Sequence, residues 1–171
     1  MPKLSAGLLL YRISADTVEV LIGHPGGPFW AKKDEGAWSI PKGEYLDDED
    51  PWAAAQREFA EEIGESVPPG EPHRLQPIRQ SGGKVVTVFA VNGELDLQGA
   101  VSNTFTLEWP KGSGVLREYP EIDRVGWMSV ALARTKLLKS QQPVLDQLMA
   151  LPDVRGHSEG VGVHDESHTS R

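Results

Sequence analysis

The sequence predicts an α/β fold in which helices lie on both sides of a mixed β-sheet. Apolar stretches of strand length and amphipathic stretches of helical length follow one another along most of the 171 residues. Hydrophobic residues make up 39% of the chain and charged residues 25%, which is ordinary for a folded globular domain. We therefore expect one domain over residues 1–151 and a flexible polar tail over residues 152–171.

Charge and composition exclude several classes of function. The net charge of −8 argues against a broad contact with long nucleic acid, because such a contact needs a basic surface. The absence of cysteine excludes disulfides and thiolate metal sites. The sequence has no apolar run of membrane-spanning length and no signal-peptide pattern, so we expect a cytoplasmic protein without membrane contact. The oligomeric state stays open.

Two strands are expected near the N-terminus, over residues 4–12 and 18–23, with a turn between them. A loop rich in glycine and proline follows over residues 24–36. Phe29 or Trp30 in this loop could stack on a base, although a surface loop packed by its own aromatic side chains is the simpler alternative.

The most strongly marked element is a helix over residues 51–63. Asp50 is a good N-cap, and Pro51 suits the first helical position. Gly64 is a plausible residue to end the helix in the left-handed conformation. The apolar side chains that recur at helical spacing and form its buried face are Trp52, Ala55, Phe59 and Ile63.

Three carboxylates crowd the last turns of this helix. Glu58, Glu61 and Glu62 occupy positions i, i+3 and i+4, where like charges repel each other. A divalent cation would reverse that repulsion, since carboxylate oxygens are ligands suited to magnesium or manganese. A solvated acidic face is the alternative for these three residues alone.

The wider spacing resembles the signature of the Nudix hydrolases. The family pattern is G-x5-E-x7-R-E-U-x-E-E-x-G-U, where U is apolar, and the chain matches it from Gly43 to Gly64. Only the last position departs from the pattern: Glu65 stands there, and the apolar residue comes two positions later, at Val67. We expect a shifted packing contact and an intact site.

The resemblance implies a Nudix α/β/α sandwich with a mixed β-sheet. It also implies an Mg²⁺-dependent hydrolase, with Mn²⁺ as a possible substitute, that cleaves a phosphoanhydride bond in a nucleoside diphosphate linked to a group X. The implied metal ligands are the Gly43 carbonyl, Glu58, Glu61, Glu62 and Glu121. The implied catalytic residues are Glu61, Glu62 and Glu121, with Glu118 as the alternative to Glu121. Glu49 and Arg57 are implied as a supporting pair joined by a bidentate bond.

The second half of the chain completes the expected fold. Strands are expected over residues 74–80 and 84–92, joined by a hairpin at Ser81-Gly82-Gly83, and over residues 102–109 and 125–128. Two amphipathic helices are expected over residues 129–138 and 141–151, the first capped by Ser129. Trp109, at the end of one strand, could stack on a base, and a surface loop is the alternative.

The string Trp38-Ser39-Ile40-Pro41-Lys42-Gly43 narrows the substrate. It resembles the same segment in Nudix enzymes that act on dinucleoside polyphosphates and diphosphoinositol polyphosphates. Lys42, Lys84 and Lys111 are candidate phosphate contacts, with solvated surface lysines as the alternative. We expect a small nucleoside polyphosphate substrate, either a dinucleoside polyphosphate or an oxidised or ordinary nucleoside triphosphate. A 5′-triphosphate RNA end is a further alternative, although the excess of acidic residues disfavours long RNA. A Nudix-fold module that binds nucleotides without hydrolysing them is the alternative function.

Overall fold

The computed structural model describes residues 3–161 and the backbone of residues 166–169. Its main sheet has eight strands, and the principal order is β10-β9-β2-β1-β6-β4. The longest strands are β1 (Leu4–Ser14), β2 (Thr17–Pro25), β6 (Val85–Asn92) and β9 (Ile122–Ser129). β1 and β6 run parallel while β1–β2 and β2–β9 are antiparallel, so the expected mixed sheet is confirmed.

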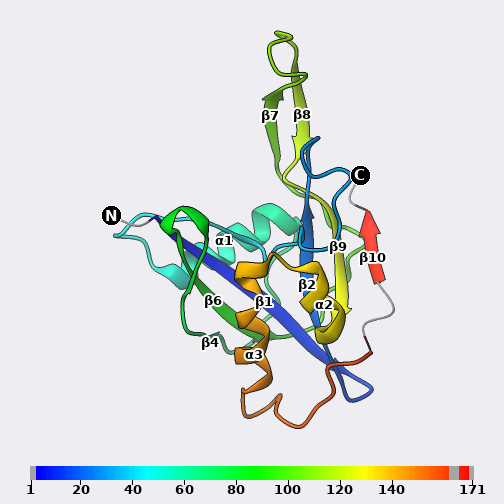
Figure 1. Ribbon diagram of the computed structural model, residues 1–171. Coiled ribbons are helices and arrows are strands. Elements are labelled where there is room, and N and C mark those ends of the chain that lie inside the picture. The colour runs from blue at the N-terminus through cyan, green and yellow to red at the C-terminus, as the bar shows by residue number, and fades with distance from the viewer. Residues whose placement is uncertain (1–2, 162–165, 170–171) are drawn as a thin grey trace.

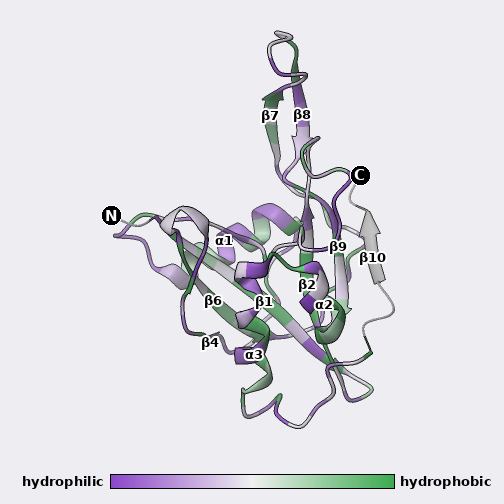
Figure 2. Ribbon diagram, in the orientation of Figure 1, coloured by the Kyte–Doolittle hydropathy of each residue, from purple (hydrophilic) through white to green (hydrophobic). Residues whose placement is uncertain are grey.

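The central strand β1 is buried on both faces. Because side chains alternate along a strand, Ala6, Leu8 and Leu10 face one layer while Leu9 and Tyr11 face the other. The first layer is α1 (Pro51–Ile63), and the second contains α2 (Val130–Lys136) and α3 (Pro143–Met149). Figure 1 shows these helices on opposite sides of the sheet, which is the expected sandwich. Figure 2 shows hydrophobic residues concentrated on the central strands.

Helix α1 begins and ends at the residues that the sequence predicts. The Asp50 carboxylate accepts a hydrogen bond of 3.0 Å from the Ala53 N–H, and Pro51 is the first helical residue. Gly64 ends the helix with φ 81°, a left-handed conformation that favours glycine. Val67 packs against the cluster beneath α1, which confirms the shifted apolar contact.

Several short elements differ from expectation. The strand expected over residues 74–80 is two separate pairs, β4 (His73–Arg74) and β5 (Ile78–Arg79), each bonded to β6. Ser81–Gly83 forms a 3₁₀ turn (η1), and a second 3₁₀ turn, η2 (Lys139–Gln141), precedes α3, so α3 is shorter than expected. The strand β3 (Lys42–Glu44), absent from the prediction, pairs with β1.

An arm stands apart from the main sheet. It is a two-stranded sheet of β7 (Thr104–Glu108) and β8 (Leu116–Pro120), and it projects from the domain (Figure 1). β7 lies within the strand expected over residues 102–109, whereas its partner β8 was not expected. The arm joins the domain next to the loop that follows β2, where a Cβ on Gly27 would lie 2.9 Å from the Phe105 ring.

The expected flexible tail is wrong for residues 152–161. Val154 is fully buried, and the Tyr11 hydroxyl donates a 2.6 Å hydrogen bond to Asp153. The Ser158 N–H donates to the Asp16 carbonyl in the turn between β1 and β2, and the Ser158 carbonyl accepts from the Val18 N–H of β2, both at 2.8 Å. Further on, β10 (Glu166–Thr169) pairs with β9. The rest of the expected tail, residues 162–165 and 170–171, lies outside the described residues.

Candidate active site

A pocket of about 610 Å³ opens beside the C-terminal half of α1. One end of the pocket is charged and is formed by β3, α1 and Glu121, which directly precedes β9. The other end is largely apolar and is formed by the loop after β2 and the base of the arm. The lining residues are Lys42, Gly43, Glu44, Glu58, Glu62 and Glu121 at the charged end, and Pro25, Gly26, Phe29, Trp30 and Phe105 at the apolar end.

Glu62 is the most deeply placed carboxylate of the charged end. Burial raises its pKa to about 8, and the nearby charges of Glu58 and Glu121 act in the same direction. The Lys42 side chain opposes this rise, and the Lys42 backbone N–H donates a hydrogen bond of 3.0 Å to Glu62. Burial also lowers the pKa of the Lys42 ammonium, so both charges of this pair are poorly solvated.

Glu58 and Glu121 show the same electrostatic strain. Burial raises the pKa of Glu58, and the charges of Glu61 and Glu49 add to that effect while Arg57 opposes it. Burial raises the pKa of Glu121, and the charges of Glu58 and Glu61 add to it. Three carboxylates from α1 and one directly before β9 therefore concentrate negative charge in and beside the charged end of the pocket.

Known proteins resemble this chain in family and in structure. The family model described as the NUDIX domain matches residues 1–148. The chain belongs to the NUDIX family. The expectation of a phosphoanhydride hydrolase is confirmed at the level of this family. A comparison with curated protein sequences found no match.

Solved structures share the fold at low sequence identity. The Ap4A hydrolase of C. elegans, in a binary complex, has a TM-score of 0.58 and 22% identity, over 85% of this chain and 96% of that one. The NUDIX domain of Shewanella oneidensis NrtR, in complex with ADP-ribose, has a TM-score of 0.59 and 16% identity, over 86% of each chain. A MutT/Nudix family protein of Listeria innocua has a TM-score of 0.55 and 14% identity, over 88% and 94%.

The NUDIX motif converges on the charged end of the pocket. Gly43 lies so close to Glu58 that a Cβ at position 43 would overlap the Glu58 carboxylate. Glu61 is not part of the pocket lining, but its charge acts on both Glu58 and Glu121. Of the two candidates before Trp127, Glu121 lines the pocket, whereas Glu118 is exposed on the arm and accepts a hydrogen bond from Thr104.

Arg57 links the parts of the motif in a way that differs from the expected bidentate bond. Its Nη1 pairs with Glu49, while Nη2 donates to Glu58 at 3.2 Å and to the Glu44 carbonyl at 3.4 Å. The guanidinium is therefore shared among three acceptors. Arg57 therefore connects the acidic loop before α1, through Glu49, and β3, through Glu44, to the Glu58 carboxylate that lines the pocket.

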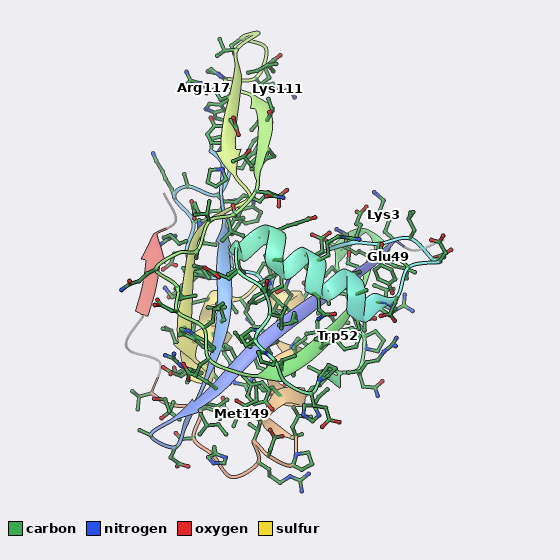
Figure 3. All side chains as sticks on the ribbon, turned by 180° about the vertical axis from the view of Figure 1, so that it is seen from behind. Lys3, Glu49, Trp52, Lys111, Arg117 and Met149 are labelled. Carbon is green, nitrogen blue, oxygen red and sulfur yellow. The ribbon has the colours of Figure 1, made fainter. Side chains whose placement is uncertain are left out.

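The three candidate phosphate-binding lysines have different places. Lys42 lines the pocket, and Lys84 is close enough for its charge to act on Lys42. Lys84 and Lys3 lie 3.7 and 3.8 Å from the Glu44 carboxylate at the pocket rim. The prediction of Lys111 as a phosphate contact is wrong. Lys111 lies in the outer part of the arm, away from α1 (Figure 3), because residues 110–114 form the tip of that projecting hairpin. Lys111 does not line the pocket.

His24 is a supporting residue that the sequence analysis does not select. It is fully buried, with Nδ1 2.7 Å from Asp123 and Nε2 2.6 Å from the Lys33 carbonyl. Each ring nitrogen thus has an oxygen of another segment within hydrogen-bond distance. His24 thereby fastens the loop carrying Phe29 and Trp30 to the strand that follows Glu121. A single histidine at the end of a strand, next to a loop rich in glycine, carries no sequence signal for this role.

The donor set fits a hard divalent cation. Carboxylate oxygens are the ligands that such ions prefer, and a cation would relieve the raised pKa values of Glu58, Glu62 and Glu121. As placed over the described residues, no three acidic or histidine side chains are close enough together to hold an ion, so side-chain rotations would have to complete the site.

Within residues 3–161 and 166–169, no helix is long and apolar enough to cross a membrane.

Proposed function

We propose that the protein is an Mg²⁺-dependent hydrolase of a phosphoanhydride bond in a nucleoside diphosphate linked to a group X. Mn²⁺ is a possible substitute for Mg²⁺. The favoured substrate is a dinucleoside polyphosphate, and an oxidised or ordinary nucleoside triphosphate is next. The observation that carries the proposal is one pocket with clustered carboxylates at one end and aromatic side chains at the other.

The charged end supports this assignment. Glu58, Glu61, Glu62, Glu121 and the Gly43 carbonyl would hold the metal, which supplies charge neutralisation for the bridging phosphates and lowers the proton affinity of water. Glu61, Glu62 or Glu121 would orient or deprotonate the attacking water. Lys42, which lines the pocket, would meet phosphate oxygens, and Lys84 is close enough for its charge to act on Lys42. Arg57 and Glu49 would hold the carboxylates in place.

The reaction breaks one P–O–P bridge. Water adds to one phosphorus, the bridging oxygen leaves with the other phosphate, and a proton of the water passes to a carboxylate. The apolar end suits a flat base, since Phe29, Trp30 and Phe105 offer aromatic surface. The neighbouring structures of an Ap4A hydrolase and of a NUDIX domain bound to ADP-ribose support a nucleotide in this place.

The test is phosphate release from a nucleotide panel, coupled to a phosphatase where needed, with and without Mg²⁺. The panel holds diadenosine tetraphosphate, ADP-ribose, 8-oxo-dGTP and ordinary triphosphates. We expect metal-dependent turnover of one member, lost in Glu62→Gln and retained in Glu71→Gln, which removes the same charge from an exposed position. Binding without any turnover would instead support the non-hydrolysing module.

A further inference from the structure

The arm presents an aromatic face that continues the wall of the pocket. Side chains alternate between the two faces of a strand pair, so Leu107 and Trp109 share the face of Phe105, which lines the pocket. The opposite strand contributes Tyr119 and Arg117 to this face, paired in register with Phe105 and Leu107. We call this surface, Phe105, Leu107, Trp109, Arg117 and Tyr119, the inner face of the arm.

Phe29 joins the inner face to the pocket. It lines the pocket, its side chain is 61% exposed, and its ring centroid lies 5.2 Å from that of Trp109 in an edge-on arrangement. The rise of about 3.3 Å per residue carries the inner face about 13 Å from Phe105 to Trp109. Aromatic surface thus runs without interruption from the pocket onto the arm.

We propose that the inner face of the arm is a second base-binding subsite. It would stack the second nucleobase of a dinucleoside polyphosphate whose reacting phosphates lie at the carboxylates. Arg117 donates its Nε–H to the Trp109 carbonyl at 3.2 Å, which places a guanidinium beside this surface. Aromatic and guanidinium planes are the groups on which bases stack. The inference rests on the proposed function and adds that the substrate carries two bases.

A protein partner fits this surface less well. Phe29 belongs both to the pocket wall and to the contact with Trp109, so a protein covering Trp109 would also cover the aromatic end of the pocket. A ligand that enters the pocket can use both surfaces at once.

The experiment measures binding in the Glu62→Gln background by calorimetry with Mg²⁺ present, so that hydrolysis does not interfere. The probes are diadenosine tetraphosphate and adenosine tetraphosphate, which have the same number of phosphates and differ by one adenosine. Trp109→Ala removes the aromatic ring, and Trp109→Phe retains one. Leu116→Ala is the matched control, because Leu116 is 70% exposed and pairs with Glu108 on the outer face of the arm.

We expect Trp109→Ala to lower the affinity for diadenosine tetraphosphate by about tenfold and to leave the affinity for adenosine tetraphosphate unchanged. Trp109→Phe should restore much of the affinity, and Leu116→Ala should change neither ligand. Equal loss for both ligands, or no loss for either, would overturn the proposal. So would a change of oligomeric state on sedimentation of Trp109→Ala, which would assign the face to a second copy of the chain.

Two further outcomes separate the possible sources of failure. Trp109→Ala could instead lower the affinity for the dinucleotide pppApA and leave that for diadenosine tetraphosphate unchanged. The subsite would then bind a base linked through the 3′ oxygen of the first nucleotide, and the dinucleoside polyphosphate assignment would be overturned. If the two-base preference and its dependence on Trp109 are found but the wild-type protein hydrolyses no nucleotide, the subsite stands and the hydrolase proposal fails.

Discussion

Glu62 is the carboxylate whose ionisation the folded protein opposes most plainly. It is largely withdrawn from water, and two further carboxylates act on it, while Lys42 supplies the nearest compensation. Metal-free cation sites are commonly unfavourable in this way, because the buried charges that bind the cation destabilise the folded protein when no cation is present.

This cost predicts how stability depends on pH. In the unfolded chain Glu62 ionises near 4.5, whereas in the folded protein its pKa is about 8. Between these values the folded state keeps a proton that the unfolded state has lost, so raising the pH favours unfolding. We expect Glu62→Gln to stabilise the metal-free protein more at about pH 8 than at about pH 5.

Urea unfolding in a chelating buffer at both pH values measures this difference. Glu71→Gln is the control, since Glu71 is exposed. Equal effects of Glu62→Gln at the two pH values would contradict the burial of this charge.

Glu121 and Glu118 offer a second comparison at single residues. Glu121 lines the pocket, whereas Glu118 lies on the arm. We expect Glu121→Gln to lower kcat by about 10²-fold or more, the usual size of a lost acid–base or metal-binding group, and Glu118→Gln to change it little. Steady-state kinetics on the substrate found in the panel makes the measurement. A large loss in Glu118→Gln alone would reverse the assignment.

The sequence could not decide between these two glutamates, for a physical reason. Both precede Trp127 in a polar stretch, and only the path of the chain from the arm into β9 determines which one turns toward α1. Lys111 was misplaced for a related reason. Its loop resembles a phosphate-binding loop in sequence. The hairpin that holds this loop away from the pocket needs β8, and the side chains of β8 are mostly exposed, so they show no alternation from which the strand could be predicted.

Among the elements, α1 was predictable because its signals are local. The cap at Asp50, the proline at the first position and the glycine at the end act within one or two turns. β3 was not predictable, since Lys42–Glu44 has no strand propensity and exists only because it pairs with β1. The motif spacing gave the metal-site candidates, while the aromatic wall and His24 depend on contacts between distant segments.

The loop between β2 and β3 depends on His24. We expect His24→Phe to lower the free energy of unfolding by about 2 kcal/mol or more, because it leaves the Lys33 carbonyl and Asp123 without their partner. KM should also rise, since the loop carries Phe29 and Trp30. Urea unfolding and steady-state kinetics measure the two effects.

Asp123→Asn is the matched variant for this prediction. It keeps an oxygen that can accept from His24 Nδ1 and removes only the charge, so its loss of stability should be smaller. If His24→Phe unfolds at the same urea concentration as the wild-type protein, His24 does not fasten the loop.

For the molecule as a whole, residues 152–161 close one end of the sandwich. Val154 enters the cluster shared by β1, β2, α2 and α3, and Glu159 pairs with Arg134 at 2.6 Å. We expect a chain ending at residue 151 to lose about 2 kcal/mol or more of unfolding free energy, because a buried side chain and several hydrogen bonds are removed.

A chain ending at residue 161 separates this effect from that of β10. It keeps the contacts that Val154, Ser158 and Glu159 make with residues 3–161, so it should be more stable than the chain ending at 151. Thermal unfolding of the two truncated chains and the full chain makes the comparison. Equal thermal unfolding midpoints for the chains ending at 151 and 161 would show that residues 152–161 do not stabilise the fold.

The strand order also constrains how the chain folds. β1 pairs with β2 across a tight turn, but its parallel neighbour, β6, is about 80 positions away in sequence, and β2 pairs with β9, about 100 positions on. Closing such long loops costs entropy before any contact repays it, which slows folding. On the ribosome, the first hairpin therefore emerges with apolar side chains on both faces. One face can be covered by α1, which ends at residue 63, but the other face waits for α2 and α3, which end only at residue 149, and a chaperone could bind that face in the interval.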